Sequence, residues 1–305
     1  MPKKSIFRLF SWSFLGRAFT MIIRHPGDLI RVPFGNNYRT LVYERRKREW
    51  MKVKERFRET PKTIRGLKIY LNPDDLSPVG VSIGTTGWLN LALTSLALNL
   101  AKPGMKVVDV GANIGYYTLL FASRVGPSGL VASFEPEPLN CSYLRRSVDA
   151  NSFRNVVVKE MAVSDSDGET LLHLSAQSEP QTHSTYFERQ GPSSNVQCTS
   201  LNSVFHSLGR ARIDILKIHV SGAEMTVLKG GLDMIEKSHP TIITVYGRVA
   251  WEETPDLLKR LSESYDFYEV VPRPWLLRRI SQIDILAREW VELCLRPKSP
   301  EFLDN

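Results

Sequence analysis

The chain has 305 residues, of which 42% are hydrophobic and 24% charged. It is therefore long enough to bury a substantial core, and its composition excludes a collagen-like or wholly disordered polypeptide. Its net charge of +8 is uneven, since residues 1–65 hold 17 Lys or Arg and 5 Asp or Glu whereas the rest of the chain sums to −4. This basic segment predicts contact with something acidic, such as a membrane surface or a nucleic acid, or else a solvated basic helix.

Residues 5–23 combine Phe, Leu, Ile and Trp side chains with arginines. Arg8 and Arg17 interrupt the apolar run, so it falls short of the roughly 20 residues that a bilayer-spanning helix needs. No small-residue cleavage site follows, so a signal peptide is not expected. The pattern fits a helix lying in a membrane interface, or one packed on the protein's own core. We expect residues 1–25 to contact an anionic membrane surface.

The three cysteines show no CxxC spacing, which is typical of isolated thiols in a reducing compartment. We therefore expect a cytoplasmic protein that is peripheral on the membrane.

A charged helix is predicted over residues 38–59, where Glu44 and Arg48 stand four residues apart and the pattern stops before Pro61. This helix and the segment before it form a basic, partly amphipathic helical extension, residues 1–65. The main domain is expected over residues 66–305.

From Gly66 onward, short apolar segments alternate with helical patterns. Strands are predicted over 66–71, 106–111, 130–135, 155–163, 215–220 and 241–246, and helices over 89–100, 116–124, 139–151, 223–237 and 255–265. Continuous apolar strands separated by helices predict an α/β, Rossmann-like fold with a parallel sheet covered by helices on both faces. Two extra strands, over 168–175 and 195–204, interrupt the alternation and are joined by a polar surface loop, 176–194.

A glycine-rich turn follows the strand at 106–111, in the sequence VVDVGANIG. Gly111 and Gly115 permit a tight turn and a close approach of backbone to ligand, and the helix that follows offers free N–H groups. Asp109 lies two residues before the first glycine, where it can order the turn and face the cationic end of a ligand. Such a turn also fits a nicotinamide-cofactor enzyme, although the spacing is GANIG and not GxGxxG.

Glu135 closes the next predicted strand, twenty residues after Gly115. In dinucleotide-binding folds, a carboxylate at this position accepts hydrogen bonds from ribose hydroxyls. The turn and Glu135 together therefore predict a site for a nucleoside-containing cofactor.

Four segments carry a resemblance to a known family: VVDVGANIGYYTLLFA (107–122), FEPEP (134–138), MAVSDSDGE (161–169) and DILKIHVSGAEMTVLKGG (214–231). In this order they resemble the FkbM family of methyltransferases that depend on S-adenosylmethionine (SAM). The resemblance implies a Rossmann-like SAM-dependent methyltransferase sheet and SAM as the cofactor. By the same resemblance, Glu135 would hold the ribose, Met161 and Ala162 would border the adenine, and the methionine part would be surrounded by Asp109, Gly111, Asn113 and Gly115.

The sequence departs from the family at the fourth of the main strands. Where the family typically has K-I-D-V-E-G-A-E, this chain has His219 and Ser221 in place of the aspartate and the first glutamate. Other family-typical acids are absent at Leu89, at Asn202 and at the end of the strand over 241–246. In one interpretation, His219 is the general base. In the other, the site has lost its acids because catalysis is no longer needed.

Lys217 shares a strand face with His219, because strand residues alternate sides. It would either hold an acidic partner or lower the pKa of His219 through like-charge repulsion. Lys217 and His219 are therefore the candidate catalytic residues.

The leading hypothesis is an enzyme that methylates a hydroxyl of a glycan, a lipid-linked sugar or a secondary metabolite. The alternative is a catalytically degenerate scaffold or interaction protein with the SAM fold. A nucleic-acid methyltransferase is a further alternative, disfavoured because the sequence has no NPPY-like motif and no K-D-K-E set. The histidines are not at metal-ligand spacing, so no metal is expected. The acceptor and the oligomeric state stay open.

Overall fold

The computed structural model describes residues 36–173, 192–248, 255–271 and 276–298. The interfacial segment predicted within residues 1–25 and most of the loop predicted over 176–194 lie outside the described residues.

An eight-stranded sheet, ordered β12-β11-β13-β10-β9-β3-β4-β5, forms the centre of the molecule. Its parallel strands are β3 (Lys106–Val110), β4 (Leu130–Phe134), β5 (Val156–Lys159), β9 (Ile215–Ile218) and β10 (Thr241–Gly247). The remaining strands are β11 (Tyr265–Val270), β12 (Leu277–Arg279) and β13 (Trp290–Pro297).

The prediction of an entirely parallel sheet was wrong at the carboxyl-terminal edge. There β13 lies between β10 and β11 and runs antiparallel to both, and β12 runs antiparallel to β11. No strand was predicted beyond residue 246, because these strands are joined by a hairpin and a short helix and not by the helix-strand alternation that marks the parallel part. The sheet is mixed.

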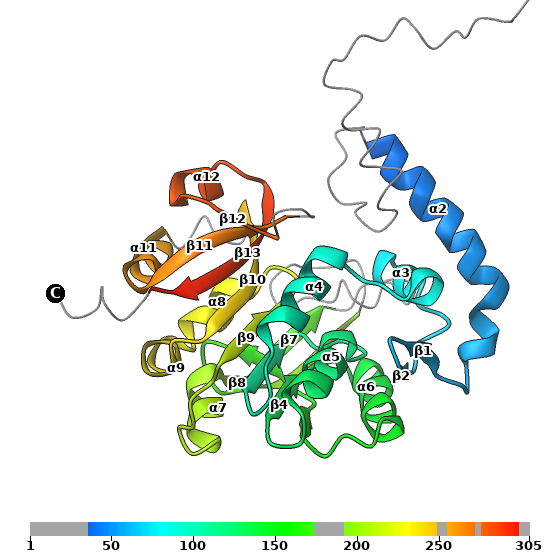
Figure 1. The fold of residues 1–305 in the computed structure, drawn as a ribbon, viewed down its shortest axis with the longest axis horizontal. Coiled ribbons are helices and arrows are strands. Elements are labelled where there is room, and N and C mark those ends of the chain that lie inside the picture. The colour runs from blue at the N-terminus through cyan, green and yellow to red at the C-terminus, as the bar shows by residue number, and fades with distance from the viewer. Residues whose placement is uncertain (1–35, 174–191, 249–254, 272–275, 299–305) are drawn as a thin grey trace, which may run out of the picture.

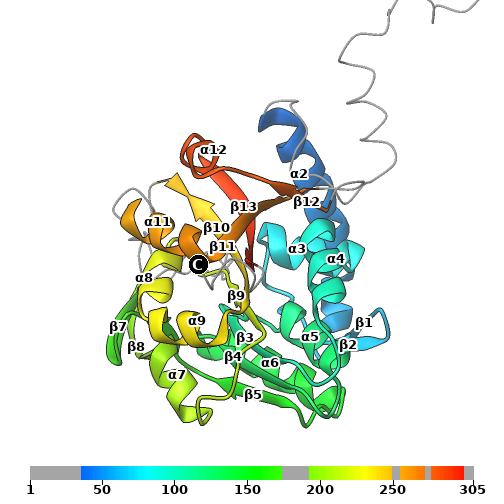
Figure 2. The same cartoon turned by 60° about the vertical axis from the view of Figure 1, so that its left-hand side comes forward.

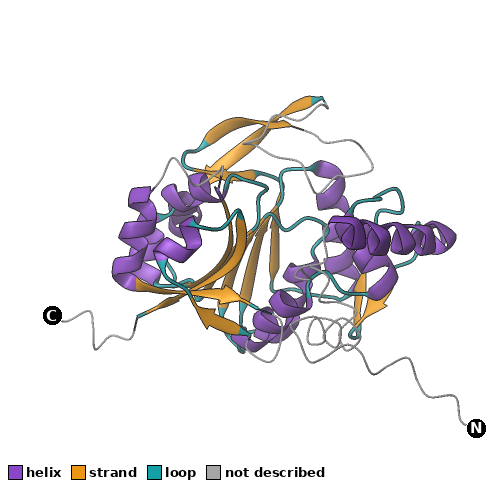
Figure 3. Cartoon of the chain, turned by 90° about the horizontal axis from the view of Figure 1, so that it is seen from above, coloured by secondary structure: helices purple, strands orange, loops and turns teal. Residues whose placement is uncertain are grey.

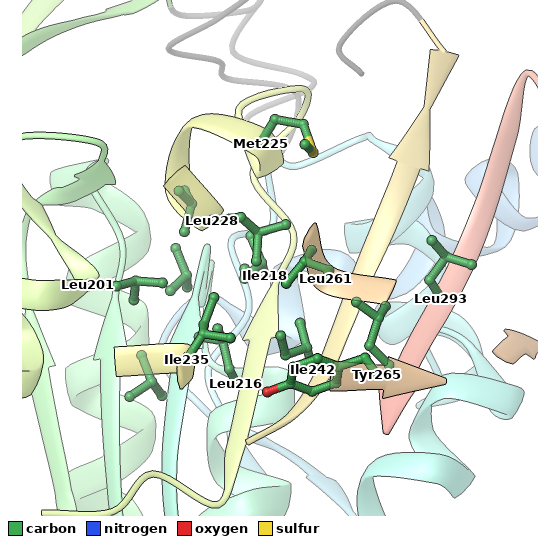
Figure 4. Packing of buried hydrophobic residues seen from close by; sticks show 14 of the residues in the cluster. Leu201, Leu216, Ile218, Met225, Leu228, Ile235, Ile242, Leu261, Tyr265 and Leu293 are labelled. Carbon is green, nitrogen blue, oxygen red and sulfur yellow. The ribbon is translucent and has the colours of Figure 1, made fainter. Parts of the chain in front are cut away.

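Helices cover both faces of this sheet (Figure 3). One face carries α4 (Leu91–Leu100), α5 (Tyr116–Val125) and α6 (Pro138–Ala150), and the other carries α7 (Leu201–Ser207), α8 (Glu224–Lys229), α9 (Leu232–Ser238) and α11 (Pro255–Ser264). Each face has its own buried cluster, and the side chains of β9 alternate between the two: Ile215 packs on one side and Leu216 on the other. Figure 4 shows the second cluster, where Leu216 and Ile218 meet helix residues such as Leu228 and Ile235.

Three predicted elements are interrupted or shortened in the structure. The helix predicted over 223–237 breaks at Gly230–Gly231, where a Cβ on Gly230 would come within 2.2 Å of the Ser164 carbonyl oxygen. The strand predicted over 155–163 divides into β5 and β6 (Ala162–Ser164). The strand predicted over 195–204 ends at Ser200, because the Ser200 hydroxyl accepts the Ser203 N–H at 3.1 Å and begins α7.

Those last two corrections involve a small second sheet of order β6-β8-β7. It contains β7 (Gly168–His173) and β8 (Ser193–Ser200), which confirm the two extra strands and pair antiparallel with each other.

The part of the predicted extension that is described packs on the domain. It comprises α2 (Asn36–Val53), a 3-10 helix η1 (Lys54–Phe57) and β1 (Lys62–Ile64). The main domain then begins with β2 (Leu67–Ile69), which forms a hairpin with β1, and α3 (Pro78–Thr86). Figures 1 and 2 both show α2 beside α3. The fully buried Trp50 joins them: its indole N–H donates to the Asp75 carbonyl at 3.3 Å, and a Cβ on Gly84 would lie 2.5 Å from its ring.

Within the described ranges, no single helix is long and apolar enough to cross a membrane. The pair α3 and α4, bent by 75° at the break between them, meets that criterion by length and composition only.

Candidate active site

A cavity of about 340 Å³ opens at the carboxyl ends of the parallel strands. It lies where the chain order reverses across the sheet, since β4 and β5 follow β3 on one side and β9 and β10 lie on the other. Ligands of open α/β sheets bind at this topological switch point, because the loops after the strands diverge there and leave a crevice. The fold therefore offers a built position for a cofactor.

The strand order arranges the predicted residues in a row along this cavity. Met161 follows β5, Glu135 follows β4, Gly111 follows β3 and His219 follows β9, and all four line the cavity. Neighbouring strands lie about 4.8 Å apart, so the row is long enough for an elongated ligand. Ala162 also lines it, beside Met161.

The glycine turn is fixed by a close backbone contact. Gly111 has φ +72°, and a Cβ there would lie 2.1 Å from the His219 carbonyl oxygen. A residue with a side chain would therefore force the turn away from the strand that carries His219. Asn113, which also lines the cavity, adopts a left-handed φ of 52° and directs its N–H to the Glu135 carboxylate at 2.9 Å.

Glu135 is the acidic group in the wall of the cavity and is only 6% exposed. Its carboxylate accepts the backbone N–H groups of Asn113 and Glu137, at 2.9 and 3.2 Å, and the Asn140 side-chain amide at 3.3 Å. Burial raises the pKa of Glu135 to about 6, and these hydrogen bonds oppose the rise. The carboxylate is thus held in one orientation and is largely ionised at neutral pH.

Asp109 does not line the cavity, which corrects the prediction that it faces a ligand cation. It is completely buried, with one carboxylate oxygen 2.9 Å from the Lys217 ammonium and the other accepting the Thr118 hydroxyl at 2.7 Å. Lys217 also donates to the Gly111 carbonyl at 2.8 Å. The Asp109–Lys217 pair therefore holds the glycine turn in place through the Gly111 carbonyl. Ordering this turn was the second role predicted for Asp109.

Gly115 likewise lies away from the cavity lining. Its φ is +93°, and a Cβ there would come within 2.4 Å of the Leu144 side chain. The glycine thus permits α5 to start against α6 and does not itself surround a ligand.

Lys217 borders the cavity but is 4% exposed, and its ammonium is committed to Asp109 and the turn. Of the two roles predicted for it, it holds an acidic partner, and its charge also contributes to lowering the pKa of His219. A direct role in catalysis for this lysine stays a prediction.

The His219 side chain borders the cavity, and its pKa is lowered to about 4. His219 is exposed, but part of it borders the cavity, where reduced hydration is the main cause of the lowered pKa, and the nearby Lys217 adds to this effect. His219 is therefore neutral at pH 7, with a ring nitrogen able to accept a proton.

The turn after His219 is held by Glu224. This buried carboxylate accepts the N–H groups of Val220 and Gly222 at 2.9 and 3.0 Å. Ser221, whose φ is +53°, borders the cavity within this turn. Glu224, which the family pattern retains, thus fixes the positions of the two residues that replace the family's acids.

Sequence reasoning missed the side of the cavity formed by the amino-terminal helices. Pro78, Val79 and Ile83 of α3 and Leu89 after it line the cavity. The three α3 residues belong to no motif, because they are ordinary apolar residues brought there by tertiary packing. Leu89 was marked in the sequence only as a position where the family typically has an acid. The aromatic rings of Tyr116 and Tyr117, at the start of α5, complete that side. Among the described residues, no group of three His, Cys, Asp or Glu side chains could hold a metal ion.

The comparisons with known proteins follow this geometry. A model described as the Methyltransferase FkbM domain matches residues 109–268, which include the glycine turn, Glu135 and His219. The chain belongs to the FkbM methyltransferase family. Members of this family are methyltransferases that use SAM.

Several curated proteins are similar to this chain over part of its length. It is 27% identical over 192 residues to Methyltransferase 1 of Beauveria bassiana, covering 55% of this chain and 74% of that protein. It is 30% identical over 167 residues to the AMB antimetabolite synthetase AmbE of Pseudomonas aeruginosa, covering 42% of this chain and 8% of the synthetase. The chain also covers 24% and 26% of the protein-L-isoaspartate O-methyltransferases of Aeropyrum pernix and Methanothrix thermoacetophila.

Among solved structures, the FkbM methyltransferase of Methylobacillus flagellatus is similar with a TM-score of 0.40 and 14% identity. That similarity covers 82% of this chain and 59% of the other.

Proposed function

We propose that this FkbM methyltransferase transfers the methyl group of SAM to a hydroxyl of a glycan, a lipid-linked sugar or a secondary metabolite. The observation that carries the proposal is the cavity in which Glu135 and His219 lie on either side of the Gly111 turn. A fixed carboxylate suits the hydroxyls of a ribose, and a neutral histidine suits the proton of an acceptor hydroxyl.

We assign a separate role in the reaction to each of several cavity residues. SAM supplies an electrophilic methyl group on its sulfonium. Glu135 would accept hydrogen bonds from the ribose hydroxyls, Met161 and Ala162 would border the adenine, and Gly111 and Asn113 would leave room for the methionine part. His219 would accept the proton of the acceptor hydroxyl at a ring nitrogen. Holding both reactants in one cavity supplies most of the rate gain in such transfers.

A catalytically degenerate protein is the second candidate. It is favoured by the replacement of two family acids by His219 and Ser221, and by the low pKa of His219, which makes the ring a weak base. Both candidates share the fold, so only binding and turnover separate them. A nucleic-acid acceptor is not proposed, because the sequence has no NPPY-like motif and no K-D-K-E set.

Replacement of Glu135 by Gln is expected to weaken SAM binding about tenfold, because a charge-assisted hydrogen bond is lost. Titration calorimetry on the wild type and the variant measures this, with Glu160→Gln as the control, since Glu160 is an exposed acid next to Met161. A folded wild type that does not bind SAM would contradict the proposal of an active methyltransferase and favour the catalytically degenerate scaffold.

The same titration has a pH dependence. Ribose hydroxyls donate to the ionised carboxylate, so the affinity of the wild type should fall as the pH drops through about 6, the pKa of Glu135. The Gln variant should show no such fall, and an equal fall in both proteins would contradict the assignment.

We also propose that the protein is cytoplasmic and attaches to an anionic membrane surface through residues 1–25. Support comes from the +12 charge of residues 1–65, from the mixture of aromatic residues and arginines near the start, and from three buried cysteines that form no disulfide. A membrane acceptor, such as a lipid-linked sugar, would suit this location.

Deletion of residues 1–25 is expected to abolish sedimentation with vesicles containing phosphatidylglycerol, because the basic aromatic segment is removed. The full chain should sediment with these vesicles and stay in solution with pure phosphatidylcholine vesicles. Sedimentation that survives the deletion would refute the assignment of this segment.

A further inference from the structure

The cavity is bounded on one side by a bent pair of helices. α3 and α4 meet at 75°, and the break between them covers residues 87–90. Pro78, Val79 and Ile83 of α3, together with Leu89 in the break, line the cavity. Movement of this break would therefore change the shape of the cavity.

α3 is held mainly by the amino-terminal layer and not by the sheet. The Lys62 ammonium donates to the Gly84 carbonyl at 2.6 Å, and Trp50 of α2 packs beneath Gly84. These contacts fix α3 to α2 and β1, but they leave the break at residues 87–90 to be positioned by other groups.

Asn90 supplies a direct link from the break to the sheet. Its side-chain oxygen accepts the Leu93 N–H at 3.0 Å and so caps α4, while its amide nitrogen donates to the Glu292 carboxylate at 2.6 Å. Because the oxygen is engaged by the cap, the NH₂ group must point to Glu292. The polarity of this contact is thus determined by the helix.

Glu292 comes from β13, the inserted antiparallel strand, and is 7% exposed. It pairs with Val245 of β10, and Ile243 of β10 pairs with Lys217 of β9. Val245 lies two residues beyond Ile243 on β10, and His219 lies two residues beyond Lys217, just after β9 ends at Ile218. Glu292 therefore stands at the end of the sheet at which His219 lies.

We propose that Glu292 is a positioning residue of the methyl-transfer site. It holds Asn90, and through Asn90 it fixes Leu89 and the end of α3 against the cavity. The chain lacks family-typical acids at positions 89, 219 and 221, and Glu292 is a buried acid that acts on residue 89 through its neighbour Asn90 without lining the cavity itself. The inference rests on the proposed function for the identity of the ligand as SAM or its product.

The polarity of the contact permits a swap experiment. In Asn90→Asp the cap on α4 is retained, because aspartate caps helices as well as asparagine, but its carboxylate meets that of Glu292. In Glu292→Gln the glutamine oxygen still accepts from Asn90. In the double variant, which combines Asn90→Asp with Glu292→Gln, the introduced glutamine amide donates to the introduced aspartate carboxylate. The hydrogen bond is then restored with reversed polarity.

Dissociation of S-adenosylhomocysteine, measured by stopped-flow fluorescence, tests the proposal. Asn90→Asp should accelerate dissociation about tenfold, the factor that corresponds to losing a hydrogen bond to a charged group. Glu292→Gln should stay within about twofold of the wild type, and the double variant should return to the wild-type rate. Glu289→Gln is the matched control, because Glu289 is exposed and pairs with Arg248 outside the cavity lining. A double variant as fast as Asn90→Asp, or an unaffected Asn90→Asp, would overturn the proposal.

Hydrogen exchange of the peptide over residues 88–96, measured by mass spectrometry without ligand, gives a second readout. Exchange should be faster in Asn90→Asp and normal in the double variant, while global unfolding temperatures report any general loss of stability. A wild type that fails to bind S-adenosylhomocysteine would refute the proposed function. The exchange measurement would then decide by itself whether the Asn90–Glu292 contact holds the break between α3 and α4. Unchanged exchange in Asn90→Asp would refute the claim that the contact with Glu292 holds this break in place.

Discussion

Replacement of Lys217 by Ala is expected to lower the free energy of unfolding by about 3–5 kcal/mol, because it leaves a buried carboxylate without its counter-charge. Asp109 is completely buried, and the Lys217 ammonium lies 2.9 Å from it and also 2.8 Å from the Gly111 carbonyl. The Thr118 hydroxyl is the second hydrogen-bond donor to that carboxylate and cannot supply a positive charge. The loss should therefore reach both the stability of the sheet and the shape of the glycine turn.

Urea denaturation at pH 7 measures this change. The double variant Asp109→Asn and Lys217→Met should recover most of the lost stability, since it removes both charges and not only one. Lys237→Ala is the control: Lys237 pairs with Asp233 on the surface, where such pairs contribute at most about 1 kcal/mol. Equal destabilisation by Lys217→Ala and Lys237→Ala would show that the buried pair does not contribute more to the free energy of unfolding than a surface pair.

Replacement of His219 by Ala is expected to reduce turnover about 10²- to 10⁴-fold while SAM affinity stays near that of the wild type, as expected for loss of a general base. His219 lines the cavity beyond the glycine turn, on the side away from Glu135. The wild-type kcat at saturating SAM should be constant between pH 8 and about 5.5. It should fall as the pH approaches about 4, the pKa of His219, because protonation occupies the accepting nitrogen.

The assay is release of S-adenosylhomocysteine with an acceptor found by screening glycans, lipid-linked sugars and secondary metabolites. His206→Ala provides the control, since His206 is exposed on α7 and lies outside the cavity lining. Turnover that survives in His219→Ala would remove the histidine from the mechanism. Absence of turnover in a wild type that binds SAM would favour the degenerate protein.

The parallel half of the sheet was predictable because its signals are local. Apolar strands such as Lys106–Val110 alternate with helices, and the glycine turn and Glu135 stand at fixed places after two of them. The carboxyl-terminal edge of the sheet was not predictable from the sequence, because the pairing of β13 with both β10 and β11 is a property of tertiary structure. The docking of Trp50 beneath Gly84 was invisible for the same reason.

The site was predictable in a similar way, by strand ends. Glu135, Gly111, Met161 and His219 follow strands, and the sheet brings them together. The direction of the Asp109 carboxylate could not be read, since it depends on Lys217, a partner more than one hundred residues later in the chain.

The apolar side of the cavity carries no local signal in the sequence. Leu89 was marked only as a position where the family typically has an acid, and Glu292 belongs to no motif. Their neighbourhood arises only from the contact between the α3–α4 break and the sheet.

The position of β13 has a consequence for how the protein is made. Domains begin to fold from the amino terminus while the ribosome still holds the rest of the chain. Until Trp290–Pro297 has been synthesised, the edges of β10 and β11 that β13 later joins stay open, and open strand edges are templates for aggregation. The same late strand delivers Glu292 to Asn90. A nascent chain can therefore form β3, β4 and Glu135 early, but the helices that border the cavity gain their hydrogen bond to the sheet only after Trp290–Pro297 has been synthesised.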